Sequence, residues 1–263
     1  TFKNEPDYYD LVRQRISMRN ALVCGVPAPL SLGYAVCGGK IVILMALIRF
    51  HSLMKVFASE EDCDEYVIRY AQFIKQLHEI RDEKRLSAFM RDLPGQELLS
   101  KADRCDRVLP EAYRGRARAI LEAADGPECL VHGDIQPNNI LISEDEMLFI
   151  DFDSFSTGRA VYDLGSLYRT LLCNENRGVS NVNSFLSLSF GKCQRIWDLF
   201  TDEYYRGEQE AVRQKSIAQA ELIGTVLALA KLIKSGDDPS LISRWAGELE
   251  RLTDQAGADD NMK

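Results

Sequence analysis

The sequence has little of what marks an exported, disulfide-bonded or zinc-binding protein. Its seven cysteines include no Cys-x-x-Cys pair, and it has only three histidines, so neither a disulfide framework nor a zinc site is indicated. No uninterrupted apolar run reaches the roughly 18 residues that a membrane-spanning helix needs, and no basic segment leads into an apolar signal region. We therefore expect a cytoplasmic chain with reduced thiols and no membrane partner.

The sequence also has fewer basic than acidic residues. The chain has 40 acidic residues against 32 Lys and Arg, which gives a formal net charge of −8. Nonspecific nucleic-acid binding depends on a basic surface that displaces counterions, so nucleic acid is not an expected partner. The acidic balance slightly favours cationic ligands, although acidic composition often serves solubility alone.

With 263 residues, the chain can form one large domain or two lobes of unequal size. The first part predicts a small α/β unit, in which a helix over residues 7–23 ends before two prolines. Leu32 to Cys37, a Gly38-Gly39 turn and Lys40 to Ile48 then have the pattern of a β-hairpin entering a buried strand. We expect a domain boundary at this strand, with residues 1–48 on one side and 49–263 on the other.

Helical periodicity dominates the larger part. From Cys63 to Ile80 the apolar positions recur at spacings of three and four, which places them on one helix face. Further helices are predicted over residues 98–125 with a break near Leu109-Pro110, and over 164–172, 193–205, 209–234 and 239–253. The polar end from Gln255 is expected to fray.

Three short apolar runs interrupt the helices and predict small strands: Cys129 to Val131, Ile140 to Ile142 and Met147 to Ile150. Asp134 and Asn139 lie in the loop between the first two runs, and Asp151 follows the third. Phosphoryl transfer needs a carboxylate for the acceptor hydroxyl and oxygen ligands for Mg²⁺. The pattern predicts Asp134 as the catalytic carboxylate and Asn139 and Asp151 as metal ligands.

Other polar and aromatic side chains allow two interpretations. We interpret His132 as a structural residue of the loop rather than an acid or base, and Asp163 as a helix N-cap that could also support the loop. Asp153 is either a second metal contact or a solvated carboxylate. His78 is expected to be buried and His51 exposed. An aromatic stripe favours core packing over a substrate wall, and its members are Trp197, Phe200, Tyr204 and Tyr205.

The segments His132-Gly-Asp-x-x-x-x-Asn139 and Ile150-Asp-x-Asp153 resemble the catalytic loop and the metal-binding strand end of the aminoglycoside phosphotransferase and choline kinase-like group. This group belongs to the protein-kinase-like superfamily. The resemblance implies an α+β fold with a small, β-rich N-terminal lobe, truncated here, and a larger, mainly helical C-terminal lobe. Asp163 resembles the downstream Asp that supports the loop in this family.

The resemblance also implies that Mg²⁺ and ATP or GTP bind between the lobes. Met45 and Leu47 would lie near the base, and Leu141 and Ile150 would line its other side. The chain departs from the family pattern at the phosphate-contacting Lys, for which Lys3 is the nearby candidate, and at that residue's Glu partner, where Gln14 or Arg15 stands.

The favoured function is transfer of a nucleotide γ-phosphate to a hydroxyl of a small molecule. Aminoglycosides, choline or ethanolamine, sugars and amino-acid-like alcohols all remain possible acceptors. The Asp-Phe-Gly and Ala-Pro-Glu markers of protein kinases are absent from the sequence. Two alternatives stay open, a nucleotide-binding or interaction module without transferase activity and a protein kinase. The sequence does not indicate an oligomeric state.

Overall fold

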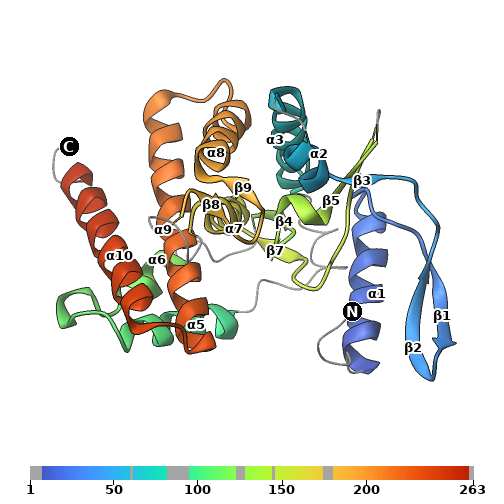
Figure 1. Ribbon diagram of the computed structural model, residues 1–263, viewed down its shortest axis with the longest axis horizontal. Helices are drawn as coiled ribbons and strands as arrows, with labels where there is room; N and C mark the ends of the chain where they lie inside the picture. Colours follow the sequence, from blue (N-terminus) through green and yellow to red (C-terminus); the bar gives the residue numbers. More distant parts are fainter. Residues whose placement is uncertain are drawn as a thin grey trace.

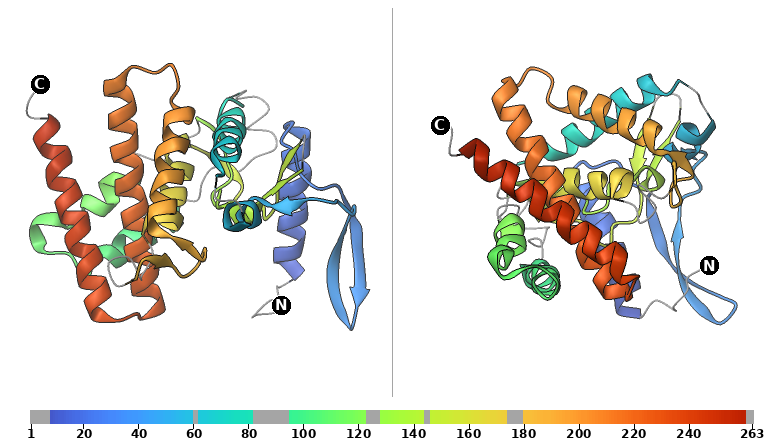
Figure 2. Two further views of the ribbon diagram at one scale, coloured as in Figure 1. Left: turned by 45° about the horizontal axis from the view of Figure 1, so that its top comes forward. Right: turned by 60° about the vertical axis from the view of Figure 1, so that its left-hand side comes forward.

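The computed structural model describes residues 8–59, 62–81, 95–122, 128–143, 146–173 and 180–260, with the side chains of 8, 95–98 and 256–260 left aside. Lys3 and the C-terminal end of the helix predicted over 98–125 lie outside these ranges. The described chain forms a small helix-and-hairpin unit at one end and a larger body of helices and short strands beside it (Figures 1 and 2).

The small unit contains helix α1 (Tyr8–Val23) and an antiparallel hairpin of strands β1 (Ser31–Cys37) and β2 (Lys40–Met45). Cys37 pairs with Lys40 across the Gly38-Gly39 turn, and both glycines have positive φ, at 60° and 79°. Two-residue hairpin turns of this kind need such backbone angles, which glycine adopts without steric cost. The predicted helix and hairpin are confirmed.

The prediction of a buried strand over Lys40 to Ile48 is wrong. Strand β2 ends at Met45, and its six residues are exposed or only half-buried. Among the described elements, only α1 packs on the hairpin through more than isolated contacts. Figure 2 shows the hairpin projecting from the body of the molecule with α1 along one side. An apolar strand is buried only where another layer covers it.

The larger body is mainly helical, and the predicted helices are confirmed. Helix α9 packs against α7, α10 and α5, while α3 packs against α8. The break expected near Leu109-Pro110 separates α5 from α6. The elements are α2 (Leu53–Ser59), α3 (Asp64–His78), α5 (Gly95–Asp106), the 3₁₀ turn η1 (Glu111–Tyr113), α6 (Arg116–Glu122), α7 (Ala160–Leu172), α8 (Phe190–Tyr204), α9 (Glu210–Ser235) and α10 (Pro239–Asp260).

The C-terminal helix is longer than predicted, because α10 continues to Asp260 instead of fraying from Gln255. The extension includes Gln and Ala, which are good helix formers, and each added residue of an existing helix contributes a hydrogen bond without a new nucleation cost. The aromatic stripe packs into the core as expected, with Trp197, Phe200 and Tyr204 buried and Tyr205 half-buried.

Helix α9 is also long and apolar enough to cross a membrane, judged by length and composition alone. An 18-residue window within it has a mean hydropathy of 1.5, and 56% of that window is buried inside the protein. A core helix surrounded by neighbours meets the same criteria. It is the single helix of this kind in the described part of the chain.

Short antiparallel strands lie between the helices. Strands β3, β5 and β6 form one sheet in that order, β4 pairs with β7, and β8 pairs with β9. The three predicted strands correspond to β4, β5 and β6, and they frame the loop over residues 132–139. The strand bounds are β3 (His51–Ser52), β4 (Cys129–Val131), β5 (Ile140–Ile142), β6 (Met147–Phe149), β7 (Ser156–Gly158), β8 (Val182–Asn183) and β9 (Leu188–Ser189).

Candidate active site

Asp163 fixes the backbone of the first residues of the loop over residues 132–139. It lies in the first turn of α7 and is fully buried. Its carboxylate accepts hydrogen bonds from the backbone N–H groups of His132 at 2.8 Å and Gly133 at 2.7 Å. The prediction that Asp163 caps the helix is wrong, since α7 begins at Ala160 and the N-cap is Arg159. The carboxylate instead satisfies two loop amides, which hydrogen-bond strongly to a charged acceptor.

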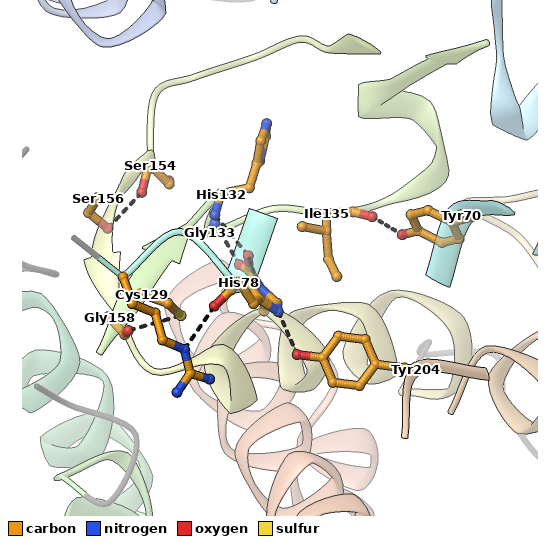
Figure 3. A network of polar contacts seen from close by, with 12 residues as sticks. Tyr70, His78, Cys129, His132, Gly133, Ile135, Ser154, Ser156, Gly158 and Tyr204 are labelled. Carbon is orange, nitrogen blue, oxygen red and sulfur yellow. Dashed lines mark hydrogen bonds and ion pairs between the residues drawn. The ribbon is translucent and has the colours of Figure 1, made fainter. Parts of the chain in front are cut away.

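A buried polar chain extends from Asp163 to a distant helix. His78, the last residue of α3, lies 3.1 Å from the carboxylate through Nε2 and 2.7 Å from the hydroxyl of Tyr204 through Nδ1. Figure 3 shows His78 next to Tyr204, with the loop residues His132 and Gly133 above it. With Nε2 donating to Asp163, Nδ1 accepts from Tyr204. His78 is buried, as predicted, and it connects the loop to α3 and α8.

His132 joins the loop to the end of strand β6. The ring is fully buried, its Nε2 donates to the carbonyl oxygen of Ile150 at 3.0 Å, and it stacks on Phe149 with centroids 5.1 Å apart. Burial lowers the pKa of His132 below the ordinary value of 6.5, which favours the neutral ring. Through these contacts His132 packs against β6 and hydrogen-bonds to its end. Such contacts are what we expect of a structural residue.

Gly133 allows two loops to pass close together. Its φ is +82°, and a Cβ at this position would lie 2.5 Å from Cβ of Ser154. Only glycine avoids both the backbone strain and this overlap. The loop is also held from its other side, because the hydroxyl of Tyr70 on α3 donates to the carbonyl oxygen of Ile135. Asp134 therefore lies between two fixed points.

The two carboxylate oxygens of Asp134 have different surroundings. Oδ2 accepts hydrogen bonds from Nε2 of Gln136 at 2.7 Å and from Nδ2 of Asn139 at 3.1 Å. Oδ1 is buried without a hydrogen-bond partner among the described residues, and Nη2 of Arg169 lies 3.6 Å from it. The carboxylate is thus oriented through one oxygen, while the other is left for a further donor.

Gln136 and Arg169 belong to this site and were missed by the sequence analysis. Gln136 had a local signal, since it lies two residues after the predicted catalytic Asp. Arg169 had none, because it reaches the site from α7, far along the chain. A cleft of about 420 Å³ opens beside these side chains and is bordered by α7 and α9.

The predicted metal ligands lie on adjoining segments. Asn139 is buried, and its side-chain hydrogen bonds to described residues both run from Nδ2 to Asp134. Within the described chain, Oδ1 of the amide is left for a ligand. The backbone oxygen of Asn139 accepts from the N–H of Ile150 at 3.0 Å, immediately before Asp151. Asp151 is exposed and has a φ of +64°. Such a backbone angle is uncommon outside glycine and often occurs at functional sites.

The donor set fits a magnesium ion. An amide oxygen and a carboxylate are hard ligands, and Mg²⁺ typically takes few protein ligands and completes its shell with water and phosphate oxygens. Among the described residues, no three His, Cys, Asp or Glu side chains gather as a ready metal site. Asp153 is exposed, and its predicted alternatives stay open.

The predicted nucleotide-lining residues lie on or just after strands of two different sheets. Leu141 on β5 and Ile150 after β6 are half-buried beside the loop. Met45, at the end of β2, is 51% exposed and Leu47 is 92% exposed. Their predicted role would explain this exposure, since a bound base would cover apolar side chains. It stays a prediction.

One of the two residues predicted at the Glu-partner position, Gln14 or Arg15, forms contacts within the small unit. Nε of Arg15 donates to Oγ of Ser31 at 3.0 Å, and the guanidinium lies 4.8 Å from the ring centroid of Tyr34. This cation–π contact and hydrogen bond tie α1 to β1.

The fold and the loop geometry define a kinase-like protein with an α+β, two-lobed architecture. The sequence matches the phosphotransferase enzyme family (APH) over residues 9–183. This match includes most of the chain, from the small unit through the loop to strand β8, and the chain therefore belongs to that family. Comparison with curated protein sequences gave no match.

Solved structures with similar folds have low sequence identity. A choline/ethanolamine kinase family protein from Mesorhizobium loti has a TM-score of 0.57 and 17% identity, over 93% of this chain and 79% of that one. An aminoglycoside phosphotransferase complexed with GDP and kanamycin has 0.58 and 17%, over 94% and 83%. An amicoumacin kinase complexed with AMP-PNP, Ca²⁺ and Ami has 0.58 and 12%, over 93% and 78%. These similarities establish the kinase-like fold.

Proposed function

We propose that this protein transfers the γ-phosphate of ATP or GTP to a hydroxyl group of a small molecule. The main support is the arrangement of Asp134, whose Oδ2 is held by two amide donors while Oδ1 is buried without a hydrogen bond. A buried carboxylate oxygen without a donor is unfavourable, and an acceptor hydroxyl would supply the missing donor. Membership of the phosphotransferase family and the adjoining cleft support the same function.

In this proposal, Asp134 positions the acceptor hydroxyl and takes its proton as the bond to phosphorus forms. Gln136 and Asn139 keep the carboxylate from rotating, and Asp163 keeps the loop backbone in place. Phosphoryl transfer depends mainly on positioning and charge stabilisation. A preorganised carboxylate therefore matters more than a strongly basic one.

Asn139 and Asp151 would hold Mg²⁺, which supplies charge neutralisation of the nucleotide phosphates when bound. The backbone hydrogen bond between Ile150 and Asn139 keeps the two segments that carry these oxygen donors next to each other. Leu141 and Ile150 on one side, and Met45 and Leu47 on the other, are proposed to contact the nucleotide base. Relatives in fold are known as complexes with GDP and with AMP-PNP.

A second candidate is a nucleotide-binding module without transfer activity. One observation favours it: Gln14 or Arg15 stands where a Glu is expected, and Arg15 forms contacts within the small unit. Without that Glu, a phosphate-contacting Lys would lack its usual ion-pair partner.

Replacing Asp134 by Asn tests the proposed function. The substitution keeps the shape of the side chain but removes the proton acceptor, so nucleotide-dependent transfer to an acceptor should fall by about 10²–10⁴-fold. Nucleotide affinity, measured by calorimetry with Mg-ATP and Mg-GTP, should change little. Asp198→Asn, an exposed change on α8, is the matched control and should keep full activity.

The result that would overturn transfer by Asp134 is undiminished activity in Asp134→Asn. Nucleotide binding without turnover, across a panel of small hydroxyl compounds, would favour the module. Phosphorylation of proteins but not of small molecules would favour a protein kinase.

A further inference from the structure

The cleft beside Asp134 is shaped by a close approach of two helices. A Cβ added to Gly165 on α7 would lie 2.5 Å from Cγ2 of Ile223, and one added to Gly224 on α9 would lie 2.6 Å from the carbonyl oxygen of Gly165. The two glycines therefore let the helix backbones pack closely. Arg169 follows Gly165 by one helical turn and Lys231 follows Gly224 by two turns, so each lies on the same helix face as its glycine. Both side chains line the cleft.

A third wall of the cleft is an aromatic side chain on an anchored loop. Phe185 lines the cleft and is 55% exposed. Its loop is held by the buried Asn183, whose Nδ2 donates to the carbonyl oxygens of Thr170 and Leu171 at 2.9 and 3.1 Å. The Oδ1 of Asn183 accepts from the backbone N–H of Phe185 at 3.1 Å. The anchored backbone thus presents an exposed aromatic ring, which offers a flat apolar surface to a ligand.

Two basic side chains of the cleft have donors that are available to an anion. Arg169 makes no hydrogen bond through its guanidinium to the described residues, and its approach to Asp134 at 3.6 Å is too long for one. Lys231 is exposed and forms no ion pair within the described chain. Apart from Asp134 itself, Asp237 is the one carboxylate among the described lining residues. The lining is thus formally neutral, with two cations and two carboxylates, but Arg169 and Lys231 both have unused hydrogen-bond donors.

We propose that the acceptor is a hydroxyl compound that carries an anionic group, a carboxylate or a phosphate, next to a ring or hydrocarbon part. Arg169 and Lys231 bind the anion, Phe185 contacts the apolar part, and the hydroxyl donates to Oδ1 of Asp134. Guanidinium and ammonium groups are the usual protein ligands of both anions. A polycationic aminoglycoside would leave the donors of Arg169 and Lys231 without an acceptor. This assignment differs from the slight preference for cationic ligands that the overall composition indicates.

The inference rests on the proposed transfer reaction, which balances without a further reactant. The acceptor oxygen forms a bond to the γ-phosphorus, and the bond from that phosphorus to the bridging oxygen of the β-phosphate breaks. The nucleoside diphosphate leaves with the bonding electrons, and the hydroxyl proton passes to Asp134.

Four compounds with one skeleton provide the test: 3-phenyllactate, its neutral amide, 2-hydroxy-3-phenylpropyl phosphate and 1-amino-3-phenylpropan-2-ol. Binding to the whole protein is measured by calorimetry without nucleotide, so it does not depend on turnover. We expect at least one anion to bind about tenfold more tightly than the amine, a difference of about 1.4 kcal/mol. Comparing the carboxylate with the phosphate identifies which anion the cleft prefers.

Charge reversal in the cleft provides the control. Lys231→Glu should abolish or invert the preference for the anion, whereas Lys234→Glu, the same change at an exposed position on the same helix, should preserve it. Tighter binding of the amine, equal effects of the two variants, or no binding of either anion at millimolar concentration would overturn the inference. Preferential, Lys231-dependent binding of an anion that is never phosphorylated would keep the anion site but reject the proposed function.

Discussion

The hairpin and the strands around the catalytic loop are both built from short apolar runs, but they are packed very differently. Ile140 and Phe149, on β5 and β6, are buried, whereas Ile41 and Leu44 on β2 are exposed. Of the fifteen large apolar side chains that are exposed among the described residues, eleven lie before residue 48. Both regions thus form the strands that their sequences favour, but the apolar side chains are buried only in the strands around the catalytic loop.

This contrast distinguishes two parts of the site: the loop, which is fixed by the helical body, and the end of the hairpin, which is exposed. The loop is held by Asp163 on α7 and by Tyr70 on α3, and His78 at the end of α3 supports Asp163. The side of the proposed nucleotide site that contains Met45 and Leu47 lies beyond the hairpin and is largely exposed. In the proposed reaction, the side that binds the acceptor is therefore preorganised, whereas the side proposed for the nucleotide base presents exposed apolar surface.

The sharpest test of this contrast compares one substitution in the two regions. Asp163→Asn leaves two buried backbone N–H groups with a single neutral acceptor, so the free energy of unfolding should fall by about 3 kcal/mol. Asp10→Asn in α1 removes only an exposed ion pair with Arg13 and should cost under about 0.5 kcal/mol. Urea unfolding measures both, and equal losses would contradict the contrast.

Two glycines with nearly the same backbone angle allow a second comparison. Gly133→Ala combines left-handed strain with an overlap at Ser154, whereas Gly39→Ala, at φ +79°, has open space around the new Cβ. The expected loss of stability is about 3 kcal/mol at Gly133 and about 1 kcal/mol at Gly39. A thermal or urea unfolding series that finds both losses alike would show that the loops do not pack as closely as described.

The packed region should also make the free energy of unfolding depend on pH, through His132. Burial lowers the pKa of His132, whereas the unfolded residue titrates near its ordinary value of about 6.5. Below that pH the unfolded chain binds a proton that the folded chain does not, so the stabilising contribution is complete above about pH 6.5 and is lost as the pH falls toward the folded pKa.

Unfolding free energies measured over a series of pH values would reveal this dependence. His132→Gln should flatten the curve below about pH 6.5 relative to the unsubstituted protein, because the titrating ring is gone. His51→Gln changes an exposed histidine and should leave the slope unaltered. An unchanged slope in His132→Gln would exclude His132 as its source.

The smallest effect is expected in the exposed region. Leu47→Gln should leave the unfolding free energy within about 0.5 kcal/mol of the original value, since the side chain is almost fully exposed. It should nevertheless weaken Mg-ATP or Mg-GTP binding by about threefold, through lost apolar contact with the base. Leu32→Gln, on β1 and also exposed, is the control; identical nucleotide affinity in both variants would remove Leu47 from the site.

The amino-acid sequence by itself determined the local structure and the order of the chemical groups. Helical periodicity located α3, the two glycines located the hairpin turn, and the spacing of Asp134, Asn139 and Asp151 indicated phosphoryl transfer. These features depend on neighbouring residues, whose preferences are visible in a single segment. The resemblance carried by the same loop led to the kinase-like fold.

The tertiary structure alone decided what those segments touch. It paired Asp163 with His78, 85 residues away, brought Arg169 to the carboxylate of Asp134, and placed Lys231 and Phe185 beside the same cleft. It also left β2 uncovered where the sequence alone suggested burial. Such outcomes depend on how whole helices and strands pack against one another, and no local pattern in the chain records which surfaces will meet.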